Sequence, residues 1–112
     1  MANNFKLVNN EVMSTVAGTS DVLYTVPSST TTIILGLTLC NVHTAQVSAT
    51  VEIVDTSASV TSTVIKDAPI PVGGSLEIMS GNKIVVETTD VVKVSSSIAD
   101  KISATMSIME IT

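Results

Sequence analysis

The sequence lacks, or nearly lacks, the side chains that carry most protein chemistry. Its 112 residues contain no Arg, no Trp, and a single His, Cys, Tyr and Phe each. Sugars and nucleic-acid bases are bound by stacking on aromatic rings, so carbohydrate and nucleic-acid binding are disfavoured. Five Lys against ten Asp and Glu give a net charge of −5, and such a chain binds phosphate backbones and anionic lipids poorly. We expect no nucleic-acid, membrane or small-molecule partner and no cofactor.

Long apolar runs are absent too. No segment reaches the ~18 apolar residues of a membrane-spanning helix, although the mean hydropathy is high at +0.53. Residues 1–10 lack the basic start and apolar core of a signal peptide. The single cysteine, Cys40, cannot form an internal disulfide, which is compatible with a reducing compartment. Excess apolar character without a membrane segment predicts burial against other subunits.

What the sequence does contain is Val, Ile, Thr and Ser in alternation. In residues 46–54, Val47, Ala49, Val51 and Ile53 alternate with polar residues. A period of two indicates an antiparallel strand with one buried face. In the last segment, residues 101–111, the even-numbered apolar residues from Ile102 onward are expected to point inward.

Eight or nine such segments follow one another, separated by turn residues. The expected strands are residues 12–16, 22–26, 33–42, 46–54, 60–66, 76–80, 83–87, 91–97 and 101–111. Residues 67–75 hold two prolines, which cannot donate to a strand ladder, and are expected to connect strands. Residues 80–82 predict a hairpin turn between their flanking strands. The pattern predicts an all-β fold, an antiparallel β-sandwich of jelly-roll or immunoglobulin-like type. We expect one sandwich domain over residues 21–112, preceded by an arm or edge strand over 1–20, exposing about 5,800 Å² in total.

Some strands break strict alternation with two adjacent apolar residues. Neighbours on a strand face opposite sides of the sheet, so one member of each pair must point outward. Several outward apolar residues together predict a surface covered by a neighbouring subunit. The pairs are Ile33-Ile34, Val85-Val86, Val91-Val92 and Ile108-Met109.

No residue set suggests catalysis or metal binding. His43 and Cys40 lie close in sequence but lack the third group of a catalytic triad, so we interpret them as structural. Phe5 and Tyr24 are expected to pack, and Gly73-Gly74 to form a turn rather than a phosphate loop. Acidic residues near turns are candidates for a calcium site. A calcium ion needs six to eight oxygen ligands, and these residues are too scattered to supply them, so we interpret them as solvated turn residues. They are Asp55, Asp67, Glu87, Asp90 and Asp100. We thus predict no catalytic, cofactor-binding or metal site.

Short motifs between residues 20 and 112 carry a family likeness. They are Leu23-Tyr-Thr-Val-Pro-Ser-Ser29, Ile65-Lys-Asp-Ala-Pro-Ile-Pro-Val-Gly-Gly-Ser75, Leu76-Glu-Ile78, Gly81-Asn-Lys-Ile-Val-Val-Glu87, Asp90-Val-Val-Lys-Val-Ser95 and Met109-Glu-Ile-Thr112. Their order and spacing resemble those of small β-sandwich virion proteins of tailed phages, especially marine and cyanophage-like ones. The first twenty residues add little to the likeness.

The resemblance implies a non-enzymatic structural protein present in many copies on the phage virion. We expect it to assemble in the host bacterial cytoplasm as a capsid decoration or cement protein. Its expected partners are further copies of itself and other virion proteins, such as the major capsid protein or neck and tail proteins. The alternatives are a neck or tail structural or accessory protein, and a surface adhesion sandwich that binds a ligand. A small enzyme on a β scaffold would need a convergent polar site.

Overall fold

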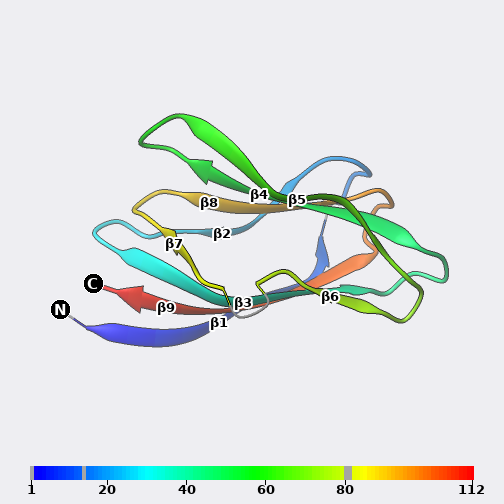
Figure 1. Cartoon of the computed structure of the whole chain (residues 1–112), viewed down its shortest axis with the longest axis horizontal. Helices are drawn as coiled ribbons and strands as arrows, with labels where there is room; N and C mark the ends of the chain where they lie inside the picture. The colour runs from blue at the N-terminus through cyan, green and yellow to red at the C-terminus, as the bar shows by residue number, and fades with distance from the viewer. Residues whose placement is uncertain (1, 14, 80–81) are drawn as a thin grey trace.

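The described residues of the computed structural model, 2–13, 15–79 and 82–112, form two antiparallel sheets stacked face to face (Figure 1). Sheet A has the strand order β1-β9-β3-β6, with β7 also paired to β3, and sheet B has the order β2-β8-β4-β5. The strands are β1 (Asn3–Met13), β2 (Asp21–Thr25), β3 (Thr31–Asn41), β4 (Val47–Asp55), β5 (Val60–Ile70), β6 (Ser75–Glu77), β7 (Ile84–Val86), β8 (Val91–Ser96) and β9 (Ile102–Ile111). No helix among these residues is long and apolar enough to cross a membrane.

The pairing pattern is that of a jelly roll. The first strand pairs with the last, β2 with β8, β3 with both β6 and β7, and β4 with β5. If β6 and β7 are counted as two parts of one interrupted strand, the chain is a single long hairpin rolled into two sheets. This is the double Greek-key arrangement of eight-stranded jelly rolls. The expected antiparallel sandwich is therefore confirmed, in its jelly-roll form.

The core lies between the sheets and is aliphatic. Val47, Ala49 and Val51 are buried as their alternation predicts, while Ile53 is half-buried. The even-numbered apolar residues of β9 are fully buried: Ile102, Ala104, Met106 and Ile108. Each buried aliphatic side chain contributes about 1.5–3 kcal/mol. The accessible surface is 5766 Å², close to the value expected from chain length.

The register of β3 differs from the simple alternation expected for residues 33–42. A bulge lies between Ile34 and Gly36 in its pairing with β9. The extra residue shifts the inward series, because two residues on a bulged strand oppose one on the partner. Ile34, Leu37 and Leu39 are buried and Leu35 is half-buried. Strict alternation over residues 33–42 predicts that Leu35 shares one face with Leu37 and Leu39, and that prediction is wrong at Leu35 because of the bulge.

Two expected boundaries change in the middle of the chain. Strand β5 continues to Ile70 through Asp67 and Pro69, which were expected to belong to a connection. Pro69 is tolerated because β5 is the last strand of sheet B. Strands β6 and β7 do not form the expected hairpin, since both pair with β3. The turn expected there falls partly on residues 80 and 81, outside the described residues.

The N-terminal segment is an edge strand rather than a free arm. Strand β1 pairs with β9 in unbroken register from Asn3 to Asn10. At its start, Ala2 and Thr112 exchange two backbone hydrogen bonds, of 3.2 and 2.9 Å. The two ends of the chain therefore lie side by side, as Figure 1 shows.

The inward face of β4 gives a direct test of the register. Replacing Val51, which is 1% exposed, by Asp buries an unpaired charge. We expect Val51→Asp to remove more than about 4 kcal/mol of stability, which leaves a domain of this size mostly unfolded. Circular dichroism and urea titration measure this. The control, Thr61→Asp on the exposed side of β5, should change stability by no more than about 0.5 kcal/mol; equal tolerance of both changes would show the register to be wrong.

Candidate assembly surface

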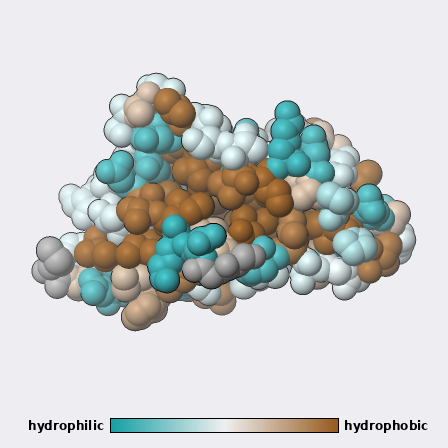
Figure 2. Space-filling view, in the orientation of Figure 1, coloured by the Kyte–Doolittle hydropathy of each residue, from teal (hydrophilic) through white to brown (hydrophobic). Residues whose placement is uncertain are grey.

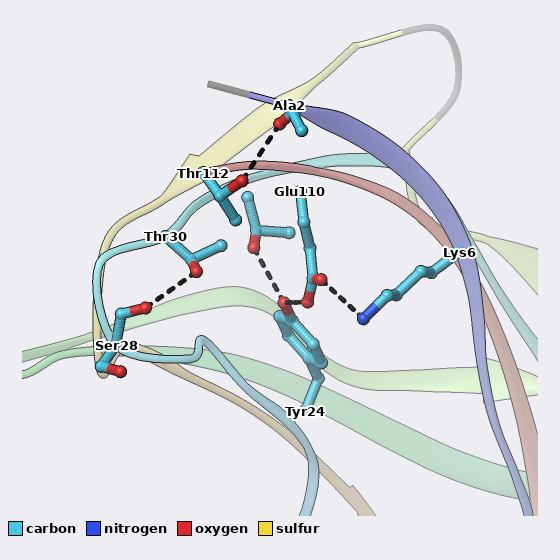
Figure 3. A network of polar contacts seen from close by, with 8 residues as sticks. Ala2, Lys6, Tyr24, Ser28, Thr30, Glu110 and Thr112 are labelled. Atoms are coloured by element: carbon cyan, nitrogen blue, oxygen red, sulfur yellow. Dashed lines mark hydrogen bonds and ion pairs between the residues drawn. The ribbon is translucent and has the colours of Figure 1, made fainter.

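A polar network centred on the buried Glu110 closes the side of the sandwich where β1 and β2 meet (Figure 3). The hydroxyl of Tyr24 donates to Glu110 Oε2 at 2.5 Å and lies 2.8 Å from Thr32 Oγ1. Lys6 Nζ lies 2.8 Å from Glu110 Oε1. Glu110 is 4% exposed and takes the next even-numbered position after Ile108 on β9. Its charge is stable there because both oxygens have partners.

The network shifts two pKa values in opposite directions. The ion pair with Lys6, followed by the hydrogen bond from Tyr24, lowers the pKa of Glu110 below its ordinary 4.5. Burial, followed by the hydrogen bond to Glu110, raises the pKa of Tyr24 from 10.0 to about 12. The carboxylate and the neutral phenol are therefore the forms that the fold stabilises. The tyrosine expected to be a packing residue is also the hydrogen-bond link between β2 of sheet B and β9 of sheet A.

The network makes stability depend on pH on the acid side. Because the pKa of Glu110 is lower in the folded state, the unfolded chain binds the proton first, and stability falls as pH drops below about 4.5. We expect Glu110→Gln to lose stability at neutral pH and to show a shallower decline in acid. Urea unfolding between pH 7 and pH 3 measures both. The control is Glu11→Gln, at an exposed position, whose stability should decline with falling pH as steeply as that of the wild type. If stability declines as steeply in Glu110→Gln, Glu110 is not the source of the acid dependence.

The outer face of sheet A carries an apolar row that crosses four strands. Phe5 on β1 lies opposite Met109 on β9, Met109 opposite Ile33 on β3, and Ile33 opposite Val85 on β7. Directly opposite residues share a face, so the row is continuous. Phe5 is 74% exposed and Val85 60% exposed. Phe5 was expected to be a packing residue, and that expectation was wrong because Phe5 occupies an exposed, outward position of an edge strand.

Charges are distributed unevenly between the two outer faces. Among the outward residues paired in sheet A, Glu77 is the one charged side chain; it lies opposite Thr38 and accepts a hydrogen bond from Thr38 Oγ1 at 2.6 Å. That bond is the main cause that lowers the pKa of Glu77. On sheet B, Glu52 lies opposite Lys93 near the middle of the face. The paired part of sheet A thus presents an almost uncharged outer face, in which the apolar row lies among neutral polar residues, and sheet B carries an opposed Glu–Lys pair near the middle of its face.

All four adjacent apolar pairs are split as the sequence predicts. One member of each pair is buried and the other is half-buried or exposed. The buried members are Ile34, Val86, Val92 and Ile108, and the outward members are Ile33, Val85, Val91 and Met109. Three of the four outward residues belong to the apolar row of sheet A, which makes this face the candidate assembly surface.

A second apolar region follows the side of the sandwich opposite β1 and β2. Figure 2 shows apolar surface in a band between the two sheets, where β5 lies over β6 and β7 in Figure 1. Half-buried apolar residues of this region pack against the core: Val64, Ile65, Leu76, Ile78 and Ile84. The described part of the chain contains no pocket.

Three of the five turn carboxylates come together. One carboxylate oxygen each from Asp55, Glu87 and Asp90 lie within 4.8 Å of one another. Asp90 is buried, so the interpretation of a solvated turn residue was wrong for it. Its carboxylate accepts the backbone N–H of Thr56 at 3.1 Å and that of Glu87 at 2.9 Å. Asp90 therefore ties the β4–β5 turn to the β7–β8 turn. Asp67 and Asp100 are exposed and stand outside this group.

This role predicts the effect of removing the Asp90 carboxylate. Asp90→Ala leaves two backbone donors without their acceptor, and we expect a loss of about 1.5–3 kcal/mol. Asp90→Asn keeps one acceptor oxygen and should lose less. Denaturant unfolding of both variants measures the difference. Because the carboxylate is already engaged by the backbone, added Ca²⁺ should leave the Tm of the wild type unchanged; a rise that follows Ca²⁺ concentration would show that the three acids bind metal.

The remaining sequence candidates occupy structural positions. Asn41 is buried at the end of β3: its amide nitrogen donates to the carbonyls of Ala45 and Ile70, at 3.0 and 2.9 Å, while its Oδ1 accepts the N–H of His43 at 2.7 Å. His43 therefore belongs to a loop organised by Asn41. Cys40 is half-buried on the outward side of β3, opposite Ser103.

The two adjacent glycines serve different needs. Gly73 has φ +70°, as a left-handed turn requires, whereas a Cβ on Gly74 would come within 3.0 Å of the Pro71 ring.

Of the polar residues whose roles were not predicted from the sequence, one could have been found there. Glu110 continues the inward even-numbered series of β9, and a charged residue at an inward position predicts a buried partner. Its partners, Lys6 and Tyr24, come from strands at the other end of the chain. No local pattern identifies them.

Comparison with known proteins gives a likeness of fold. No family model matches the chain, and no curated protein matches it. Among solved structures, a chain in the crystal structure of the T13 IBDV viral particle matches at TM-score 0.54 and 10% identity, over 96% of this chain and 30% of that one. A chain in the structure of infectious bursal disease virus Gx strain matches at 0.52 and 14% identity, over 96% and 32%. The chain thus spans less than a third of the length of these viral chains.

Proposed function

We propose that this protein is a non-enzymatic structural component of a phage virion, present in many copies as a capsid decoration or cement protein. The observation that carries the proposal is the apolar row on the almost uncharged outer face of sheet A, on a chain whose net charge is −5. An almost uncharged face with an apolar row suits attachment to a protein lattice, while the opposite sheet, with its Glu52 and Lys93 pair, suits exposure to water.

Two further points support the proposal. The fold is a jelly roll, an architecture used in viral capsid domains as well as in lectins and cupins. Two solved chains with a similar fold belong to an animal virus, infectious bursal disease virus, rather than to a phage. The phage assignment itself comes from the motif order in residues 20–112.

In this function the outer face of sheet A binds the capsid surface. Val85, Ile33, Met109 and Phe5 lie in one row and bury together. Removing apolar area from water contributes about 25 cal/mol per Å² before the costs of association. Because every copy presents the same face, attachment repeats with the symmetry of the underlying lattice.

Purified particles of the phage that encodes this chain test the proposal. We expect a copy number in fixed proportion to the major capsid protein, measured by quantitative gel densitometry, and regular density over the capsid in cryo-EM. Density confined to a ring at the neck or tail would favour the alternative of a neck or tail component. Absence of the chain from the particles would overturn the virion assignment.

A matched pair of variants tests the surface. Particles stripped of the protein are mixed with purified Val85→Lys or with Thr61→Lys, which places the same charge on β5 of sheet B. We expect Val85→Lys to lose binding to the particles and Thr61→Lys to bind as the wild type does. The reverse order would assign attachment to sheet B.

A further inference from the structure

The four edges of the two sheets are not equally protected against pairing with another strand. An edge strand exposes unpaired N–H and C=O groups, and proteins blunt such edges with short strands, prolines, bulges or charges. Strand β2 has five residues and a bulge between Val22 and Tyr24. Strands β6 and β7 have three residues each.

Strand β5 is also blunted, although it is long. Its register with β4 shifts twice around Val51, and Pro69 offers no N–H. Asp67 has φ 48° and turns its N–H to Thr50 Oγ1 at 3.0 Å. Such a kinked edge does not present a straight row of donors and acceptors.

Strand β1 carries none of these devices over its first eight residues. It has 11 residues without proline, and its register with β9 is continuous from Asn3 to Asn10. Its lysine, Lys6, points inward to Glu110 instead of guarding the edge. The outward side chains Phe5 and Leu7 are 74% and 63% exposed. Each has a cross-strand neighbour on β9 and none on the free side of the sheet.

The backbone groups on the free side of β1 can be assigned. Ala2 and Thr112 exchange two hydrogen bonds, so they form a hydrogen-bonded pair. Hydrogen-bonded and non-bonded pairs alternate along an antiparallel ladder. Residues 4, 6 and 8 therefore bond to β9, and the N–H and C=O groups of Asn3, Phe5, Leu7 and Asn9 point away from it. The same four residues supply the side chains of the outer face at this edge.

We propose that two copies of this chain pair through the free edges of β1, antiparallel and around a two-fold axis perpendicular to sheet A. Identical strands satisfy each other's donors and acceptors in this arrangement. The two-fold keeps the outer faces of both sheets on one side, so the two apolar rows become one surface. The low charge at this edge lets two chains of net charge −5 approach each other.

This inference deepens the proposed function and rests on it for the use of the dimer in a particle. The pairing itself is a property of the isolated chain. A stable protein–protein interface buries about 1,200–2,000 Å² of accessible surface, and pairing through a single strand edge buries less. We therefore expect a weak dimer that forms at high concentration. Absence of the dimer in solution and absence of binding to particles are therefore separate results, and each can be observed without the other.

Sedimentation equilibrium of the purified chain over a wide concentration range tests the pairing. We expect a reversible monomer–dimer equilibrium in the wild type. Leu7→Lys should raise its Kd about tenfold or more, because it places two like charges across the pair. Asn9→Pro removes one outward N–H and no apolar group, and should weaken the dimer too. The control Val85→Lys, with similar exposure at the far end of the apolar row, should leave the Kd within about twofold.

Circular dichroism confirms that each variant is folded before its Kd is compared. A wild type that stays monomeric at millimolar concentration overturns the proposal. So does a dimer that Val85→Lys weakens as much as Leu7→Lys, since that result shows packing of faces instead of edges. The proposal is also overturned if β1 pairs with another virion protein and not with itself. In that case the wild type stays monomeric in solution, and Asn9→Pro abolishes its binding to particles.

Discussion

The pairing of β1 with β9 is the interaction on which the rest of the structure depends. It joins the two ends of the chain and adds the outermost strand to sheet A. It also brings Lys6 to Glu110, so that a carboxylate in the last strand is neutralised by a residue near the first. Tyr24 then links that carboxylate to β2 in the other sheet. A buried charge is costly unless paired, so strand pairing and side-chain pairing require each other here.

The same pairing creates the surface that we associate with assembly. Every strand added to a sheet moves the free edge outward by one strand, and in sheet A that edge is β1. Its outward residues extend the row begun by Val85, Ile33 and Met109. A jelly roll has two outer faces and four open edges. In this chain the apolar row and the unprotected edge belong to the same sheet, while the Glu52 and Lys93 pair and a kinked edge belong to the other.

The parts of the fold that follow from periodicity were predictable, and those that depend on distant partners were not. Alternation located β4, β8 and β9 and predicted that each of the four apolar pairs is split between the two sides of its sheet. It failed at the β3 bulge, because an extra residue shifts the face without changing composition. It also failed at Pro69, because whether a strand lies at an edge is a property of the sheet. The Asp90 and Asn41 contacts join loops far apart in sequence, and the outward Phe5 depends on where the sheet ends.

The strength of the proposed assembly follows from repetition more than from any one contact. Phe5 and Leu7 expose apolar area on one strand, which supports only weak pairing in solution. Copies held side by side on a lattice meet at a high effective concentration, so a weak edge contact adds to the binding of each face without further contact area. A blunted edge could not contribute in this way, and an unblunted edge on all four sides would risk uncontrolled aggregation. Three protected edges and one open edge limit such pairing to a single direction, and a two-fold contact closes on itself after two copies.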